Sequence, residues 1–154
     1  NVAGIVGLGK AAEIARQEME SDARRVGSLR DYLEMELLRI ENTTLNGNPK
    51  QRLYNTSSIS FKDADADAII IGLDNFALSN GSACSSASVK PSHVLKAMGI
   101  KDEDAFSTIR FSLGRFNAIE EIDITIREVK KVIKNLRLMV NLCSGRKPSN
   151  SKPS

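Results

Sequence analysis

One cysteine stands in a setting that suits chemistry better than packing. Cys84 lies within residues 80–88, whose sequence Asn-Gly-Ser-Ala-Cys-Ser-Ser-Ala-Ser has almost no side-chain bulk. Such neighbours offer no apolar surface, so we expect the Cys84 thiol to be exposed and mobile. A mobile thiolate can take an atom from a reaction centre and carry it to an external acceptor. From composition alone, an incidental cysteine in a loop is an equally good interpretation of Cys84.

A second candidate is an arginine on the polar side of a predicted strand. Apolar and polar residues alternate over residues 108–113, which predicts a half-buried strand with Arg110 pointing away from the apolar layer. Its planar guanidinium is suited to clamping a carboxylate, although a surface ion pair is the simpler role when Arg110 is taken alone. Arg115, just after Gly114, is a weaker candidate for the same task.

The other candidates for catalysis or metal binding are weaker still. His93 is the only histidine, and no acidic residue lies close in sequence to orient it, so a thiol hydrolase using Cys84 and His93 is kept only as a rival. One histidine and two distant cysteines cannot assemble a zinc site. Four aspartates have a spacing similar to that of a calcium loop: Asp63, Asp65, Asp67 and Asp74. Ala68 stands where such a loop needs glycine, so we favour a solvated strand end and expect no metal.

The elements that must position these residues follow from the spacing of apolar side chains. We predict helices over residues 2–40, 66–73, 91–99 and 117–140, and strands over residues 53–61, 76–79 and 108–113. Asn1 can cap the first helix, and Asn117 with Glu120 has the spacing of a capping box for the last. This order predicts an α+β fold in which helices cover a small sheet.

Size and charge narrow the class of protein. The chain has 154 residues, 41% of them hydrophobic, and a net charge of +3, which suits one globular domain. Residues 144–154 hold three basic side chains and no acid, so they account for the whole net charge of +3 (+3 − 3 = 0). The rest of the chain is therefore neutral overall, which gives no sign of a basic surface for nucleic acid. We expect a long connecting helix over residues 1–42, a domain over residues 43–143 with a cysteine loop at residues 79–90, and a disordered basic tail over residues 144–154.

The expected environment is a reducing one. No apolar run is long enough to span a membrane and no signal peptide is evident, so the expected location is cytoplasmic. Cys84 and Cys143 lie in different settings, and we expect no disulfide between them.

Several motifs together resemble one enzyme family. Residues 79–88, followed by Pro-Ser-His-Val-Leu at residues 91–95, resemble the active-site loop of NifS/IscS-type cysteine desulfurases. The sequence Ile-Arg-Phe-Ser-Leu-Gly-Arg-Phe at residues 109–116 resembles the later strand of that family, and residues 1–7 resemble the start of its long helix. The resemblance runs from about residue 1 to residue 142. It implies the small C-terminal domain of the aspartate-aminotransferase-like fold.

The resemblance also implies a reaction and its participants. In this family pyridoxal phosphate binds L-cysteine, a loop thiolate attacks the substrate sulfur, and L-alanine leaves. By resemblance Cys84 carries the resulting persulfide to an iron–sulfur scaffold or another sulfur acceptor, with a transient role as an iron–sulfur ligand during transfer. Arg110 corresponds to the arginine that grips the substrate carboxylate. The complete enzyme is expected to be a homodimer.

One departure from the family limits what this segment can do. The family holds its cofactor with a lysine after a Ser-His pair in the large domain, and no lysine here stands in that context. We therefore expect a fragment, a proteolytic product or one piece of a split enzyme, which alone binds no cofactor and turns over no cysteine. A stand-alone sulfur-carrier or scaffold-binding module without cofactor is the alternative.

Overall fold

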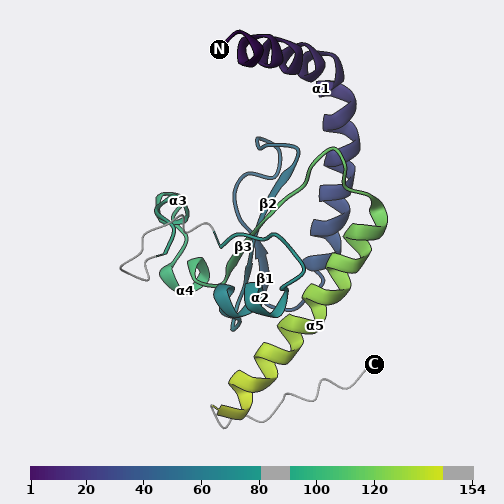
Figure 1. The fold of residues 1–154 in the computed structure, drawn as a ribbon. Coiled ribbons are helices and arrows are strands. Elements are labelled where there is room, and N and C mark those ends of the chain that lie inside the picture. Colours follow the sequence, from purple (N-terminus) through teal and green to yellow (C-terminus); the bar gives the residue numbers. More distant parts are fainter. Residues whose placement is uncertain (81–90, 144–154) are drawn as a thin grey trace.

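The computed structural model describes residues 1–80 and 91–143, and shows helices packed around a small sheet (Figure 1). Five helices and three strands make up this described part: α1 (Val2–Leu37), β1 (Thr43–Leu45), β2 (Thr56–Phe61), α2 (Ala66–Gly72), α3 (His93–Ala97), α4 (Asp102–Ala105), β3 (Thr108–Ser112) and α5 (Ile119–Cys143). The strands form an antiparallel sheet in the order β1-β2-β3. The predicted mixture of helices and a small sheet is confirmed.

One face of the sheet is apolar and forms the core with α1, α2 and α5. The strands contribute Ile59, Phe61, Ile109 and Phe111, and the rings of Phe61 and Phe111 meet edge to face with centroids 6.5 Å apart. Three groups of helical residues cover them: Val26, Leu33 and Leu37 from α1, Ile69 from α2, and Ile122, Ile126, Val129 and Ile133 from α5. Burying each large apolar side chain contributes about 1.5–3 kcal/mol, so this face is the main source of stability.

Only the second half of α1 belongs to this core. Its first half carries exposed apolar side chains such as Ile5, which is 71% exposed, whereas its buried residues begin at Val26. In Figure 1 the N-terminal part of α1 bends and projects away from the sheet. Asn1 caps the helix as predicted, since its side-chain oxygen accepts from the Gly4 amide at 3.0 Å. Neither long helix of the described chain is apolar enough to cross a bilayer.

The opposite face of the sheet is polar and is partly roofed by α4. The Asn46 side-chain amide donates to the Ser60 hydroxyl (2.8 Å), and the Thr108 hydroxyl donates to the Asp104 carbonyl (2.6 Å). The Ser60 and Thr108 hydroxyls are hydrogen-bonded to each other at 2.7 Å, which links the two contacts into one chain. Ser60 and Thr108 are buried beneath α4. Sequence reasoning missed both β1 and α4, because each is too short to show a hydrophobic period.

Several predicted boundaries are wrong by a few residues. The helix predicted over residues 2–40 ends at Leu37, and the strand predicted over residues 53–61 begins at Thr56. The helix predicted over residues 91–99 is confined to His93–Ala97, although Gly99, with φ +78°, ends the segment as expected. Residues 76–79 form no strand, and only an isolated bridge joins Ser79 to β3. The apolar spacing thus located these elements but did not locate their ends.

The start of α5 shows why the predicted capping box is wrong. The Glu121 carboxylate accepts from the Ala118 amide at 3.0 Å, so the box is shifted by one residue from Asn117 and Glu120. Asn117 instead closes the preceding turn, because its side-chain oxygen accepts from the Gly114 amide at 2.7 Å. The Asn117 side-chain amide, and then the Ala118 amide, lower the pKa of Glu121.

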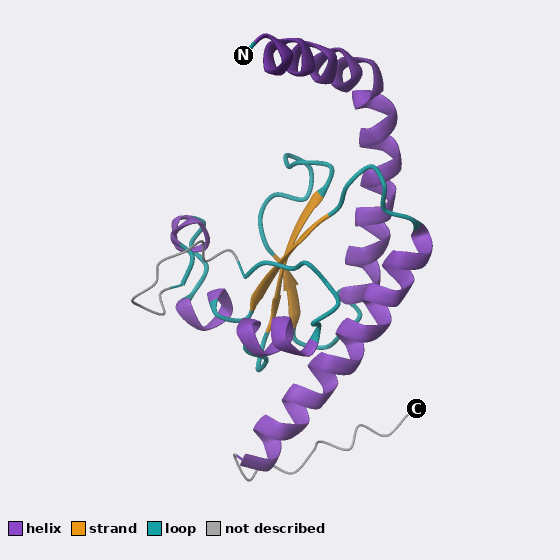
Figure 2. Cartoon of the chain, viewed as in Figure 1, coloured by secondary structure: helices purple, strands orange, loops and turns teal. Residues whose placement is uncertain are grey.

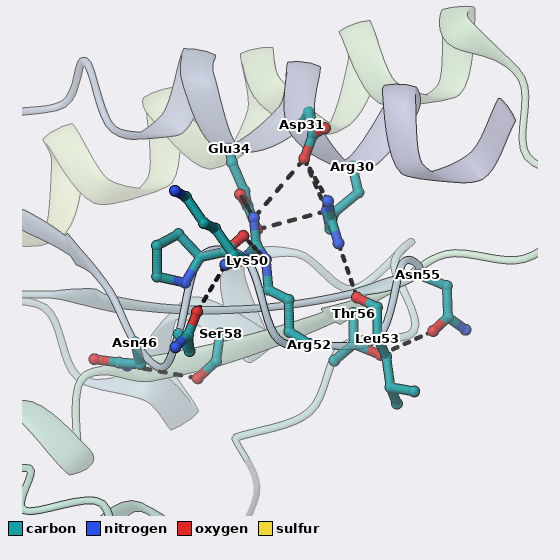
Figure 3. A network of polar contacts seen from close by, with 12 residues as sticks. Arg30, Asp31, Glu34, Asn46, Lys50, Arg52, Leu53, Asn55, Thr56 and Ser58 are labelled. Atoms are coloured by element: carbon teal, nitrogen blue, oxygen red, sulfur yellow. Dashed lines mark hydrogen bonds and ion pairs between the residues drawn. The ribbon is translucent and has the colours of Figure 1, made fainter. Parts of the chain in front are cut away.

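A buried ionic network fastens the segment before β2 to α1 (Figure 3). The Arg52 guanidinium pairs with both carboxylate oxygens of Glu34, which raises the pKa of Arg52, and the Glu34 side chain is only 6% exposed. Arg30 donates to Asp31 at 2.6 Å and to the Leu53 carbonyl at 2.8 Å. This network fixes where the chain enters β2, and the spacing of apolar residues gave no sign of it.

Replacing Arg52 with methionine would leave the buried Glu34 carboxylate without its bidentate partner. We expect the free energy of unfolding in urea to fall by about 3 kcal/mol. Arg127→Met is the matched control, because the Arg127 side chain is 68% exposed and its loss should cost less than about 0.5 kcal/mol. Equal effects of the two substitutions would contradict a structural role for the Arg52–Glu34 pair.

Candidate functional site

Arg110 lies in the middle of β3 and is exposed on the polar face of the sheet, as its place in the alternating pattern predicted. Its cross-strand partner on β2 is Ser58, and the next pair along this face is Thr56 with Ser112. The Arg110 side chain forms no hydrogen bond or ion pair with the residues that the structure describes. Among the described residues, none of the five donors of the guanidinium is used, and the neighbouring cross-strand residues carry hydroxyl groups. The chemistry of this cation suits a carboxylate ligand.

The beginning of the cysteine loop lies directly beside this arginine. The Arg110 amide donates to the Ser79 carbonyl at 2.7 Å, which forms the isolated bridge between the two residues. The next residue, Asn80, donates its side-chain amide to Asp67 on α2 at 2.6 Å. Cys84 and the rest of residues 81–90 lie outside the described residues, so the structure tests neither the exposure nor the motion predicted for its thiol.

The other candidates from the sequence are scattered. His93 is the exposed first residue of α3, and its ring has no hydrogen-bond partner among the described residues. Two of the four aspartates have local structural tasks: Asp65 caps α2 by accepting from the Ala68 amide at 3.0 Å, and Asp67 binds Asn80. Asp65 and Asp67 thus lie at the start of α2, and not at the end of a strand as the sequence predicted. Asp63 lies in the turn between β2 and α2.

Arg115 has a structural task that sequence reasoning missed. Its guanidinium pairs with Glu18 and with Asp22 on α1, the latter at 2.8 Å. In return Arg25 donates to the backbone carbonyl of Arg115 and, at 2.9 Å, to that of Asn117. Arg115 therefore holds the end of β3 against α1, whereas the Arg110 side chain has no partner among the described residues.

The described residues do not form a site for pyridoxal phosphate. A Schiff-base lysine has to be enclosed so that its pKa falls, yet every described lysine is exposed or half-buried. A pocket between residues 76–78, the end of β3 and the start of α5 is lined mostly by apolar side chains, with Glu121 as its charged residue. No lysine, arginine or histidine lines this pocket. The described residues thus include an exposed arginine whose chemistry suits a carboxylate, and no enclosed lysine.

The sequence and the fold together define the class of protein. Residues 1–125 match the family described as aminotransferase class-V, and the chain belongs to this family. Its relatives include cysteine desulfurases named IscS from Shewanella denitrificans (46% identical) and Shewanella baltica (47% identical), each over 135 residues. The resemblance to NifS/IscS-type enzymes that the cysteine loop predicted is confirmed. The match covers 88% of this chain but 33% of each relative, so the chain spans about a third of their length.

Solved structures give the same result for the fold. A NifS-like protein from Rickettsia africae superposes with a TM-score of 0.76 at 31% identity, covering 87% of this chain and 35% of that protein. DndA from Streptomyces lividans superposes with a TM-score of 0.51 at 31% identity, covering 70% of this chain and 30% of that protein. The packing of α1 and α5 on a three-stranded sheet is therefore shared with NifS-like proteins.

The contrast between Arg110 and Arg115 predicts opposite effects on stability. Arg110→Met removes no contact with the described residues, so the free energy of unfolding should change by less than about 0.5 kcal/mol. Arg115→Met breaks two ion pairs with α1 and should lower it by about 1 kcal/mol. Urea denaturation of both variants measures the difference. A larger loss for Arg110→Met than for Arg115→Met would refute this division of tasks.

Proposed function

We propose that this chain is the small C-terminal domain of a NifS/IscS-type cysteine desulfurase. The complete enzyme converts L-cysteine and the Cys84 thiol into L-alanine and a Cys84 persulfide. The thiolate sulfur bonds to the substrate sulfur while the carbon–sulfur bond breaks, and the electron pair left on carbon takes up a proton. The reaction therefore balances without an external oxidant. The observation that carries the proposal is the hydrogen bond from Arg110 to Ser79, which starts the cysteine loop beside the carboxylate clamp.

Covalent geometry supports the reach that this reaction requires. Cys84 follows Asn80 by four residues, so their Cα atoms are at most about 14 Å apart. Ser79 and Arg110 are bridge partners, whose Cα atoms lie about 5 Å apart. A substrate whose carboxylate is bound by Arg110 is therefore within range of the Cys84 thiol. A loop that began at the far end of the sheet would lack this property.

The remaining parts of the proposal concern the complete protein. Pyridoxal phosphate is its cofactor, held by residues outside this chain, and its partners are L-cysteine and an iron–sulfur scaffold or other sulfur acceptor. The enzyme acts as a homodimer in the cytoplasm and binds neither nucleic acid nor membrane. Within the chain, residues 1–42 are the connecting segment that contains α1, residues 43–143 the small domain and residues 144–154 the tail. This segment alone is inactive, because a carboxylate clamp and a thiol cannot cleave the carbon–sulfur bond unaided.

Two rivals make different demands on Cys84. A stand-alone sulfur carrier would accept sulfur without a cofactor-binding domain. A thiol hydrolase would need His93 as a base for Cys84, and His93→Ala would then abolish the reactivity of the thiol. The exposed position of His93, without a partner to orient its ring among the described residues, favours neither a base nor a fixed catalytic pair.

A mass measurement separates the proposal from the carrier. This chain can be incubated with L-cysteine and pyridoxal phosphate, both alone and as a chimera in which it replaces the matching third of IscS from Shewanella baltica. We expect the chimera to gain one sulfur atom on Cys84 and the chain alone to gain none. Cys84→Ser should abolish the gain but keep the absorbance of the bound cofactor, and Cys143→Ser is the matched control. Sulfur loading of the isolated chain from a cofactor-free donor would instead favour the carrier.

The carboxylate clamp is tested by substrate kinetics in the same chimera. Arg110→Ala should raise the KM for L-cysteine by about 10- to 100-fold, because a charge-assisted hydrogen-bond pair to the carboxylate is lost. Arg115→Ala, which loosens α1 but leaves Arg110 in place, serves as the control and should change KM much less. An unchanged KM for Arg110→Ala would remove this residue from the substrate site.

A further inference from the structure

Asp67 holds Asn80, the second residue of the cysteine loop and the last one described before Cys84. The side-chain amide of Asn80 donates to its carboxylate at 2.6 Å, a short distance typical of a hydrogen bond to a charged oxygen. Asp67 lies in the first turn of α2, where the helix dipole favours a negative charge. The hydrogen bond therefore links Asn80 directly to α2.

Asn80 is the last side chain before Cys84 that the structure describes. Gly81 has no side chain, and Ser82 and Ala83 have two of the smallest. The residue before Asn80 is held through its backbone, since the Ser79 carbonyl accepts from the Arg110 amide at 2.7 Å. Two consecutive residues are thus attached to two different elements, to β3 through the backbone and to α2 through a side chain.

The support beneath Asp67 is rigid. Ile69, two residues further along α2, is completely buried in the core. Gly72 lies so close to α5 that an added Cβ would be 2.9 Å from Val132. Asp65 caps the same helix. Because α2 is fixed at its start, middle and end, a hydrogen bond to Asp67 holds Asn80 in place relative to β3 and Arg110.

We propose that Asp67 is a positioning residue for sulfur transfer. By holding Asn80 it fixes the direction in which the chain leaves Ser79, and this raises the effective concentration of the Cys84 thiol at a substrate bound to Arg110. In this proposal Asp67 acts through Asn80, so it affects the rate of persulfide formation and not substrate binding. This inference rests on the proposed function, and it assigns to Asp67 a task that the sequence pattern did not suggest.

The kinetic test uses the chimera with IscS. Asp67→Ala should slow persulfide formation in a single turnover by about 3- to 10-fold and leave the KM for L-cysteine within about two-fold, since only one hydrogen bond to a charged group is lost. Asp67→Asn keeps an oxygen acceptor without the charge, and its rate should fall between those of Asp67→Ala and the parent. Asp74→Ala is the matched control: this carboxylate follows α2 and contacts Asn75, not Asn80.

A second measurement uses this chain by itself, without the part taken from IscS, and does not depend on activity. Hydrogen exchange of the Arg110 amide, which donates to Ser79, should accelerate in Asp67→Ala and not in Asp74→Ala. If exchange and persulfide formation both match the parent, Asp67 only stabilises its helix and the inference is overturned. If exchange accelerates but the parent chimera forms no persulfide, the anchor stands and the proposed function fails. A raised KM in Asp67→Ala would assign it to substrate binding, which also overturns the inference.

Discussion

A three-stranded sheet has two faces, and this chain has enough apolar helix surface to cover one of them. The buried stretches of α1 and α5 lie side by side on the face formed by Ile59, Phe61, Ile109 and Phe111 (Figure 2). Because side chains alternate between the two faces along β3, its remaining side chains lie on the other face. Arg110 has to lie on the opposite face, because a shift of one residue would bury its charge and expose two of the largest core residues.

The same constraint explains why the two candidate residues belong together. The edge of β3 that is not paired with β2 is free to accept another backbone segment, and Ser79 occupies it at Arg110. The cysteine loop therefore begins beside Arg110, to which it is joined by a main-chain hydrogen bond. Arg115 and Arg25 hold the far end of β3 against α1, so the strand that carries the clamp is fixed beyond its last residue.

The sequence predicted the elements and residues that are marked by hydrophobic periodicity or by residue type. It did not predict very short elements, or contacts between residues far apart in the chain. The long helices, β2 and β3 were recognised, because each repeats apolar side chains at its own period. β1 is three residues long and α4 four, too short for any period to be visible. Arg110 was identified by its place in an alternating strand, whereas Asp67 gave only the weak signal of an acid in a first helical turn. Its partner Asn80 is thirteen residues away, and no local pattern encodes such a contact.

The hydrogen bond between Arg110 and Ser79 has a consequence for an enzyme assembled from two domains. Any movement of this domain relative to a cofactor-binding domain would carry the carboxylate clamp and the origin of the cysteine loop together. Domain motion would therefore leave the distance between Arg110 and Ser79 unchanged. Placing one of the two groups on the other domain would instead make their distance vary with every opening. The outer edge of β3 meets this requirement with a single backbone bridge.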